Sequence, residues 1–230
     1  MMAPELEKPI IYLITSGATT AATTAASEEF SNLLWLVKAA VTAKVTLIQI
    51  REKSLTARVL FELTELAAEL TRGSQSQLLV NDRPDIARAA GADGVHLSTT
   101  SVPAPVIRRT FGSKFLVGVS THSLEELEQA SQEGADFAVF GPVFSTESKR
   151  RFGPPVGLKL MAEAAKAVAP WPVLALGGIT VQNAYECFRA GASGVAAIRM
   201  LSDPTGLAAT VGKLREIYEN LGKSSKPNER

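Results

Sequence analysis

Residues 91–97 read GADGVHL, and the pattern of this short stretch is repeated along the chain. Its first part returns as GADFAV at 134–139 and as GASGV at 191–195, each time after a helical pattern and before an apolar run. Glycine readily takes the left-handed conformation that ends a helix. Each copy therefore predicts a helix that turns directly into a buried strand.

Short apolar runs follow one another along the chain and are separated by longer helical patterns. They lack clean polar alternation, which is typical of parallel strands buried on both faces. We predict strands at 10–14, 45–50, 78–80, 94–97, 115–119, 137–140, 172–176 and 194–198. Eight such βα units in about 220 residues predict an α/β protein, a single-domain (β/α)8 TIM barrel over 1–221 with a polar C-terminal tail at 222–230. An open doubly wound sheet is the alternative, but no G-x-G-x-x-G stretch follows the first strand.

The helical patterns carry their own start signals. Ser123 with Glu126 three residues later is a capping box, which predicts a helix start. Thr180 and Asp203 are expected to cap two further helices, with Pro204 at the first helical position of the second. The other helices are predicted at 30–43, at 55–70 and, as a short one, at 85–90.

Composition excludes several classes of protein. The chain has 230 residues, of which 46% are hydrophobic and 20% charged, the profile of a soluble globular protein. A formal net charge of +1 argues against a nucleic-acid partner held by a broad basic field. Cys187 is the single cysteine, and His96 and His122 are the two histidines, so zinc-type metal centres are not expected. With no signal peptide pattern or membrane span, we expect a cytoplasmic protein without a membrane partner; the oligomeric state stays open, a homo-oligomer included.

Polar side chains gather just after the predicted strands, at the end of a barrel where active sites lie. They are Gln49, Arg51, Lys53, Asn81, Asp82, Ser120, His122, Thr146, Ser148, Lys149, Gly177, Gly178 and Arg199. Cations outnumber carboxylates in this set, so we expect it to hold an anion, most simply one or two phosphate groups. The Gly177-Gly178 turn before the helix predicted at Thr180 offers backbone N–H groups as a phosphate seat.

A structural interpretation is open for several of these residues. Arg51 and Lys53 could pair with Glu52 and neighbouring helices, and the run at 149–151 could be partly a solvated loop in which only Lys149 has a role. Three other residues also have a purely structural interpretation. Asp82 could cap the short helix, and His122 could be part of the cap at Ser123. For His96, a satisfied histidine in the interior is the preferred interpretation.

Seven stretches of the chain resemble the thiamine phosphate synthase and TenI superfamily of (β/α)8 barrels. They are IQIREKS (48–54), LLVNDRPDIA (78–87), GADGVHL (91–97), VGVSTHSLEE (117–126), FGPVFSTESK (140–149), LALGGIT (174–180) and AGASGVAAI (190–198). Each one is modest evidence, but the set, in the family's order, is specific.

The resemblance implies a transferase of thiamine biosynthesis. Synthases of this family join hydroxymethylpyrimidine diphosphate to thiazole phosphate and release thiamine phosphate and pyrophosphate. The matching positions imply Gln49, Arg51, Lys53, Asn81 and Lys149 as pyrimidine-diphosphate binders, Asp82 as a Mg²⁺ ligand, Ser120 at the reacting pyrimidine, Thr146 and Ser148 at the thiazole phosphate, and Gly178 as the backbone phosphate seat. Of these, Ser120 and Lys149 are expected to be catalytic.

The chain departs from the synthase pattern at three places. The family usually continues VHL with Gly-Gln-x-Asp, and that aspartate is the second Mg²⁺ ligand, whereas Ser101 stands there in this chain. A hydroxyl replaces a carboxylate poorly around Mg²⁺. Arg199 stands where a small hydroxyl residue is common, and we expect it to reach a phosphate directly. The first strand ends in Thr15-Ser16, where Asp-Arg is frequent.

Two alternatives to the synthase hypothesis stay open. TenI-type relatives are thiazole tautomerases, which implies an isomerase that uses His122 as a proton shuttle without a metal; such proteins often have a serine at the position of Ser101. That branch tends to lose the residues matched here by Gln49, Lys53 and Asp82. The second alternative is a barrel that binds thiazole phosphate or thiamine phosphate without turnover.

Overall fold

The computed structural model describes residues 6–145 and 154–224, in which eight parallel strands form a closed barrel. The strands are β1 (Ile10–Ile14), β2 (Leu47–Ile50), β3 (Gln77–Asn81), β4 (Gly94–Leu97), β5 (Leu116–Thr121), β6 (Phe137–Phe140), β7 (Val173–Leu176) and β8 (Gly194–Ala197). Each strand pairs with the next, and β1 pairs with β8, where Ile11 lies opposite Val195. The sheet therefore has no free edge, and the predicted (β/α)8 barrel is confirmed.

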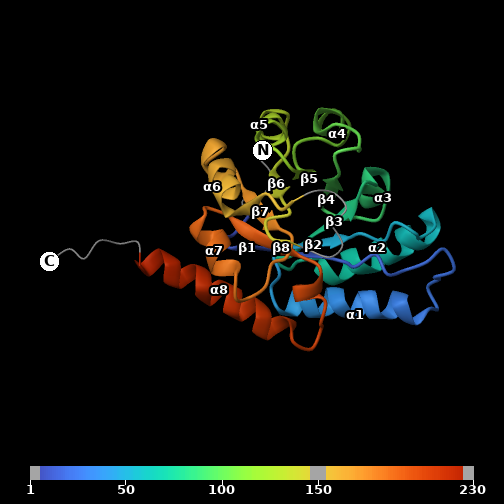
Figure 1. The fold of residues 1–230 in the computed structure, drawn as a ribbon. Helices are drawn as coiled ribbons and strands as arrows, with labels where there is room; N and C mark the ends of the chain where they lie inside the picture. The colour runs from blue at the N-terminus through green and yellow to red at the C-terminus, as the bar shows by residue number, and fades with distance from the viewer. Residues whose placement is uncertain (1–5, 146–153, 225–230) are drawn as a thin grey trace.

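Helices surround the barrel (Figure 1). They are α1 (Glu28–Thr42), α2 (Ala57–Thr71), α3 (Pro84–Ala89), α4 (Ala104–Phe111), α5 (Leu124–Gln132), α6 (Gly157–Ala167), α7 (Ala184–Arg189) and α8 (Leu207–Ser224), with a 3-10 turn, η2 (Arg199–Leu201), before α8. Helix α8 contacts both α7 and α1, which closes the outer ring (Figure 1). Within the described ranges, no helix combines the length and apolar character that crossing a bilayer requires.

Helix starts agree with the sequence prediction at one site and differ at two. Ser123 caps α5, since its hydroxyl accepts the backbone N–H of Glu126 at 3.2 Å. Thr180 caps the turn that leads into α7: its hydroxyl accepts the N–H of Asn183 at 3.3 Å, the Asn183 side chain accepts the Thr180 N–H at 2.8 Å, and the Thr180 carbonyl accepts the N–H of Ala184 at 3.0 Å. These bonds form a separate turn, and α7 itself begins only at Ala184, so its predicted start was too early.

The predicted start of α8 was also too early. The Asp203 carboxylate accepts the N–H groups of Thr205 at 2.9 Å and Gly206 at 3.1 Å, so it caps a separate turn that contains Pro204. The helix begins at Leu207 and continues to Ser224, three residues into the stretch predicted as a polar tail. Residues 225–230 of that tail lie outside the described residues.

The core has two layers. The larger layer lies between the strands and the helices, and the smaller one fills the inside of the barrel. The inner layer consists of Ile10, Tyr12, Ile14, Leu47, Leu79, Leu116, Phe137, Val139, Leu174 and Ala196. Because side chains alternate along a strand, these residues also determine which later residues of each strand face the mouth of the barrel.

Residues just before the even-numbered strands bind backward to the preceding strand. The Asp93 carboxylate accepts the N–H of Leu78 at 2.7 Å, and the Asp136 carboxylate accepts the N–H of Val117 at 2.7 Å. Both aspartates belong to the repeated GAD turns. The Thr46 hydroxyl accepts the N–H of Ile11 at 3.2 Å in the same way. These side chains clip β1 to β2, β3 to β4 and β5 to β6 at the amino-terminal end of the barrel.

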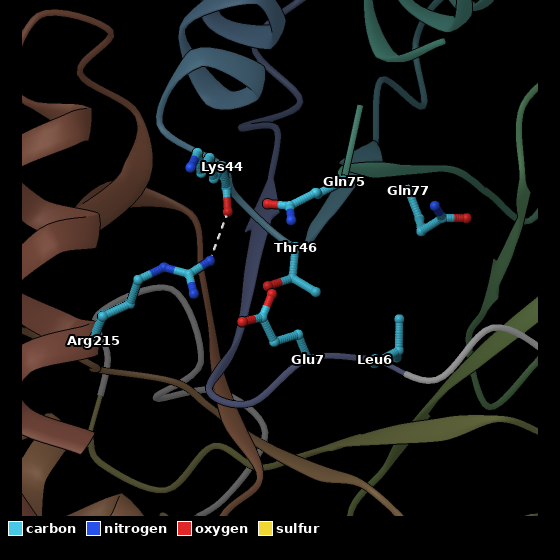
Figure 2. Close-up of a pocket in the computed structure, with 7 residues that line it drawn as sticks. All are labelled: Leu6, Glu7, Lys44, Thr46, Gln75, Gln77 and Arg215. Carbon is cyan, nitrogen blue, oxygen red and sulfur yellow. Dashed lines mark hydrogen bonds between the residues drawn. The ribbon is translucent and has the colours of Figure 1, made fainter. Parts of the chain in front are cut away.

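The amino-terminal end also has an open hollow of about 240 Å³. Figure 2 shows Arg215 of α8 donating to the backbone carbonyl of Lys44, a hydrogen bond of 2.8 Å, with Thr46 and Glu7 among the lining residues. These contacts join α8 to the β1–β2 side of the barrel. Active sites in barrels of this type lie at the opposite end of the strands, so we assign the hollow a structural role.

Candidate active site

Strand alternation turns the predicted polar residues toward one end of the barrel. Leu47 and Leu79 belong to the inner layer, so Gln49 and Asn81, two residues further along β2 and β3, face the mouth. The same alternation from Leu116 directs Ser120 of β5 inward. The expectation that these side chains share the carboxyl-terminal end follows from the closed parallel topology.

A hydrogen-bonded chain crosses from β2 to the end of β3. The Gln49 side chain donates from Nε2 to Oδ1 of Asn81 at 3.3 Å, and Asn81 donates from Nδ2 to Oδ2 of Asp82 at 2.8 Å. Gln49 is buried, whereas Asn81 and Asp82 are partly exposed. This chain fixes the orientation of both amides and aligns the Asp82 carboxylate beside them.

The Asp82 carboxylate is bound from the other side by the segment after β4. Ser98 donates its backbone N–H at 3.1 Å and its hydroxyl at 3.4 Å, and the Ser101 hydroxyl also donates to Asp82. Burial raises the pKa of Asp82, but the hydrogen bonds from Ser101 and Ser98 and the charge of Lys53 outweigh burial and hold this pKa below its usual value. Asp82 does not cap α3, in which the cap position is Arg83.

Arg51 and Lys53 lie on the same face as this carboxylate. The charge of Lys53 acts on Asp82, and the charges of both Asp82 and Arg51 act on His96. The ion pairs within the described ranges are Arg58–Glu62, Arg83–Asp85 and Arg108–Asp136. The alternative in which Arg51 and Lys53 pair with Glu52 is therefore wrong, because Glu52 binds a different partner.

His96 lies inside the barrel and touches the site through Ser120. Its Nε2 lies 2.9 Å from the Ser120 hydroxyl oxygen. Burial lowers the pKa of His96 to about 4, so the ring is neutral near pH 7. Its ring centroid lies 5.6 Å from that of Tyr12, and neither the His96 Nδ1 nor the Tyr12 hydroxyl has a hydrogen-bond partner in the described part of the chain. The interior position preferred for His96 is confirmed, but the ring is not fully hydrogen-bonded, and it contacts a candidate catalytic residue, which the sequence did not predict.

Gly118 makes room for this arrangement. A Cβ atom at Gly118 would lie 2.3 Å from the Phe137 ring and 2.8 Å from Nδ1 of His96. Since Gly118 pairs in register with both His96 and Phe137, its missing side chain is the space that the two rings occupy. Glycine at this position is what allows His96 to reach Ser120.

His122 lies at the exposed rim and contributes to two contacts. Its backbone N–H donates to the Glu126 carboxylate at 2.7 Å, which supports the capping role open from the sequence. Its ring Nδ1 is hydrogen-bonded to the backbone carbonyl of Gly141 at the end of β6. A carbonyl oxygen only accepts, so Nδ1 carries the proton and Nε2 is the unprotonated nitrogen in the neutral ring.

The predicted phosphate seat after β7 is formed by a tight backbone turn. Gly177 and Gly178 both have positive φ values, 99° and 65°, and a Cβ on Gly178 would lie 2.8 Å from Cβ of Phe144. The amide of Asn183 donates to the Gly178 carbonyl at 2.9 Å. Among residues 6–145 and 154–224, the N–H groups of Gly178 and Ile179 have no hydrogen-bond acceptor, so they are available to an anion.

The structure describes one of the four remaining predicted residues, Arg199. Arg199 is exposed and begins η2 directly after β8. Thr146, Ser148 and Lys149 lie outside the described residues. The chain that leads to them passes the phosphate seat, because a Cβ on Gly178 would lie 3.0 Å from the carbonyl oxygen of Ser145.

Sequence reasoning missed one polar cluster completely. Glu52 is buried, with 3% of its surface exposed, and binds the loop between β1 and α1 through Gly17 and Thr19. The same loop is bound at Thr15, whose hydroxyl accepts the N–H of Arg51 at 2.8 Å. The signal in the sequence was the loop TSGATTAATTAA, which has no helical or strand period but is rich in hydroxyl groups.

Comparison with known proteins agrees with this geometry. The family model described as thiamine monophosphate synthase (TMP-TENI) matches residues 12–201. The chain belongs to the thiamine monophosphate synthase family. The matched region contains every candidate site residue from Thr15 to Arg199. It also includes the part of the β6–α6 loop that the structure does not describe.

Individual members of the family are similar over most of the chain. A thiamine-phosphate synthase of Roseiflexus castenholzii is 42% identical over 202 residues, which cover 87% of this chain and 85% of that protein. One of Moorella thermoacetica is 41% identical over 184 residues, covering 80% and 87%. Among solved structures, thiamine phosphate pyrophosphorylase from Pyrococcus furiosus superposes with a TM-score of 0.74 and 28% identity, covering 92% of this chain and 96% of that one.

Proposed function

We propose that this protein is a thiamine-phosphate synthase, a transferase that joins hydroxymethylpyrimidine diphosphate to thiazole phosphate in thiamine biosynthesis. The observation that carries the proposal is the hydrogen-bonded chain from Gln49 through Asn81 to Asp82, with the charge of Lys53 acting on that carboxylate. Amides, cations and one carboxylate together suit a diphosphate attached to a heterocycle. The similarity to proteins named thiamine-phosphate synthases supports the same activity.

The reaction needs charge stabilisation and positioning. The thiazole ring nitrogen forms a bond to the pyrimidine methylene carbon, and the bond from that carbon to the diphosphate oxygen breaks, its electron pair leaving with pyrophosphate. Arg51, Lys53 and Lys149 would stabilise the negative charge that develops on pyrophosphate. Holding both substrates in line supplies about 7–11 kcal/mol of the barrier reduction. No protein nucleophile is required.

Specific roles follow for the remaining residues. We assign Gln49 and Asn81 to the pyrimidine diphosphate and Ser120, oriented by His96, to the reacting pyrimidine. The thiazole phosphate would be bound by the N–H groups at Gly178, the hydroxyls of Thr146 and Ser148, and Arg199.

Mg²⁺ fits this site as an ion shared with the substrate. Within the described ranges, no cluster of three or more His, Cys, Asp or Glu side chains is present. Mg²⁺ is commonly held by one or two carboxylates together with substrate phosphates. Asp82, with the hydroxyls of Ser98 and Ser101 beside it, would hold such an ion. When bound, Mg²⁺ would neutralise charge on the departing pyrophosphate.

The test is a reconstitution with both substrates and Mg²⁺. Pyrophosphate release and thiamine phosphate formation are measured together, with each substrate omitted in turn as controls. We expect both products in equal amounts. If no product forms even with enzyme at the concentration of the substrates, the synthase proposal fails; tight binding of thiamine phosphate in calorimetry would then favour the non-catalytic binder.

Thiazole tautomerisation is the second candidate, and one contact favours it. Because Nδ1 of His122 is bound to the Gly141 carbonyl, Nε2 is free to accept a proton, and no described residue bonds to it. A neutral imidazole held in this tautomer can move a proton on a bound heterocycle. The candidate is tested by following isomerisation of the thiazole carboxylate phosphate with and without His122→Ala. If the variant isomerises as fast as the unmodified protein, this candidate is rejected.

A further inference from the structure

Glu52 is a buried carboxylate next to the candidate site, and its three hydrogen bonds all come from one loop. Its Oε1 accepts the backbone N–H of Gly17 at 3.0 Å, and its Oε2 accepts the N–H of Thr19 at 3.2 Å and the Thr19 hydroxyl at 2.7 Å. These three donors come from one short loop, more than thirty residues earlier in the chain. A carboxylate accepts only, so it matches a set of three donors better than any other side chain of this size.

Gln49 of β2 and Arg51, just after β2, bind the same loop at Thr15. The Arg51 N–H donates to the Thr15 hydroxyl at 2.8 Å, and the Thr15 N–H donates to the Gln49 carbonyl at 3.0 Å. The loop after β1 is therefore joined to the end of β2 and the two residues that follow it by five hydrogen bonds at buried or part-buried positions. Such a network resists displacement, because breaking one bond leaves a buried polar group unpaired.

The loop in turn lies against the Arg51 side chain. Gly17 has a φ of +73°, and a Cβ atom there would lie 3.2 Å from the Arg51 carbonyl oxygen and 3.4 Å from its Nη1. One guanidinium nitrogen of Arg51 therefore lies in the space beside Gly17, so a shift of the loop would change the space open to Arg51.

We propose that Glu52 is a positioning residue that clamps the β1–α1 loop and thereby holds the Arg51 guanidinium where it binds the diphosphate. The inference rests on the proposed function, because it assumes that Arg51 contacts that substrate. It assigns to Glu52, which lies between two cations in the sequence, a role that is neither an ion pair nor a contact with substrate.

The first test is Glu52→Gln. The glutamine amide has one oxygen acceptor, which can serve either Gly17 or Thr19, and its NH₂ group would face the donors of the other residue. The loop therefore loses at least one hydrogen bond to residue 52. We expect kcat/KM for the pyrimidine diphosphate to fall about a hundredfold, because a displacement of about 1 Å at a site costs that much. The KM for thiazole phosphate should be unchanged, since its proposed ligands lie after β6, β7 and β8.

A milder pair of variants separates the hydrogen bond from the shape of the loop. Thr19→Val removes the hydroxyl that donates to Glu52 and keeps the branched side chain, whereas Thr19→Ser keeps the hydroxyl. We expect Thr19→Val to lower kcat/KM for the diphosphate about tenfold, as loss of one bond to a charged group does, and Thr19→Ser to retain activity. These variants keep the test informative if Glu52→Gln does not fold.

Asp93→Asn is the matched control for a purely structural effect. Asp93 is also a carboxylate that accepts a backbone N–H, but it lies at the amino-terminal end of the barrel. We expect its amide variant to lower the melting temperature and leave kcat/KM unchanged. If Glu52→Gln behaves like Asp93→Asn, with a lower melting temperature and unchanged kinetics, Glu52 has only a structural role and the inference is overturned.

Calorimetry with inorganic pyrophosphate and Mg²⁺ distinguishes failure of the inference from failure of the proposed function. We expect the unmodified protein to bind pyrophosphate and Glu52→Gln to bind it about tenfold more weakly. Equal affinities would overturn the role of Glu52 even in a protein that shows full synthase activity. Lack of synthase turnover in the unmodified protein would instead count against the proposed function, and the comparison of affinities would still decide the role of Glu52.

Discussion

The imidazole Nε2 of His96 lies 2.9 Å from the hydroxyl oxygen of Ser120, so a histidine inside the barrel is hydrogen-bonded to a serine at its mouth. The contact depends on the register of β4 and β5, in which His96 lies opposite Gly118, two residues before Ser120. Burial keeps this histidine neutral. The candidate site is thus connected to the interior of the fold by an uncharged hydrogen bond, and this connection has a consequence for stability at acidic pH.

We predict that stability falls as the pH drops from about 6.5 to about 4. In that range the unfolded chain binds a proton at His96, whereas the folded chain, with a pKa lowered from 6.5 to about 4, does not. The free energy of unfolding should decrease by about 3 kcal/mol across the range because of this residue. Urea denaturation at pH 7 and pH 4 measures the loss. In His96→Gln, which does not titrate, the decrease should be smaller by that amount, and equal decreases would refute the prediction.

We predict that Gly118→Ala destabilises the protein by about 1–3 kcal/mol, because the added Cβ overpacks the space that the His96 and Phe137 rings occupy. The displaced imidazole should also lower synthase activity through Ser120. Gly212→Ala is the matched control: Gly212 lies in α8, a Cβ there meets no atom within 4 Å, and alanine should add about 0.5–1 kcal/mol of stability. Chemical denaturation of both variants checks the signs, and a neutral Gly118→Ala would mean that the barrel interior adapts.

We predict that Ser101→Asp creates a tighter Mg²⁺ site. Ser101 already touches Asp82, so an aspartate there would place two carboxylates together. Without metal the like charges should lower the melting temperature, and Mg²⁺ should restore it. The Mg²⁺ concentration for half-maximal pyrophosphate release should fall about tenfold, equivalent to about 1.4 kcal/mol, with a higher rate. Ser101→Asn, similar in size but uncharged, controls for shape; the same Mg²⁺ dependence in all three proteins would show that a missing carboxylate does not limit the enzyme.

We predict that Lys149→Ala lowers kcat about a hundredfold, which corresponds to about 3 kcal/mol of transition-state stabilisation. The expectation rests on the position of Lys149 in the stretch FGPVFSTESK after β6. Lys159→Ala, the same substitution on the exposed surface of α6, should leave kcat unchanged. Steady-state rates of pyrophosphate release decide the matter, and similar rates for the two variants would remove Lys149 from the catalytic set.

Most of the fold was predictable because hydrophobic periodicity and turn glycines are local signals. Each strand overlaps its predicted run, but some ends differ: β2 begins two residues later than predicted, at Leu47, β3 extends one residue beyond its run at each end, and β5 continues two residues further, to Thr121. The starts of α7 and α8 were predicted too early, at Thr180 and Asp203. Both residues have an oxygen that can cap a helix, but in the structure each caps a separate turn that precedes the helix. A choice between two local hydrogen bonds of similar strength is decided by the surrounding tertiary contacts.

The candidate site was predictable as far as topology alone determines it. Once eight strands are parallel and closed, the residues that follow them must share one end, which brings together Gln49, Asn81 and Ser120. The clamp at Glu52 was not predictable, because it joins residues 33 to 35 positions apart through side-chain geometry. Neither was the contact of Ser98 and Ser101 with Asp82, which depends on how the chain turns after β4.

The clips made by Thr46, Asp93 and Asp136 divide the circular sheet into consecutive two-strand modules. At the corresponding place before β8, Ser193 donates only its backbone N–H, to the carbonyl of Val173 at 2.8 Å. A polypeptide nicked between β2 and β3, or between β4 and β5, would keep every clip within one fragment, whereas a nick between β3 and β4 would separate Leu78 from Asp93. Complementing fragments should therefore reassemble more readily when the nick lies between these pairs than when it lies inside one of them.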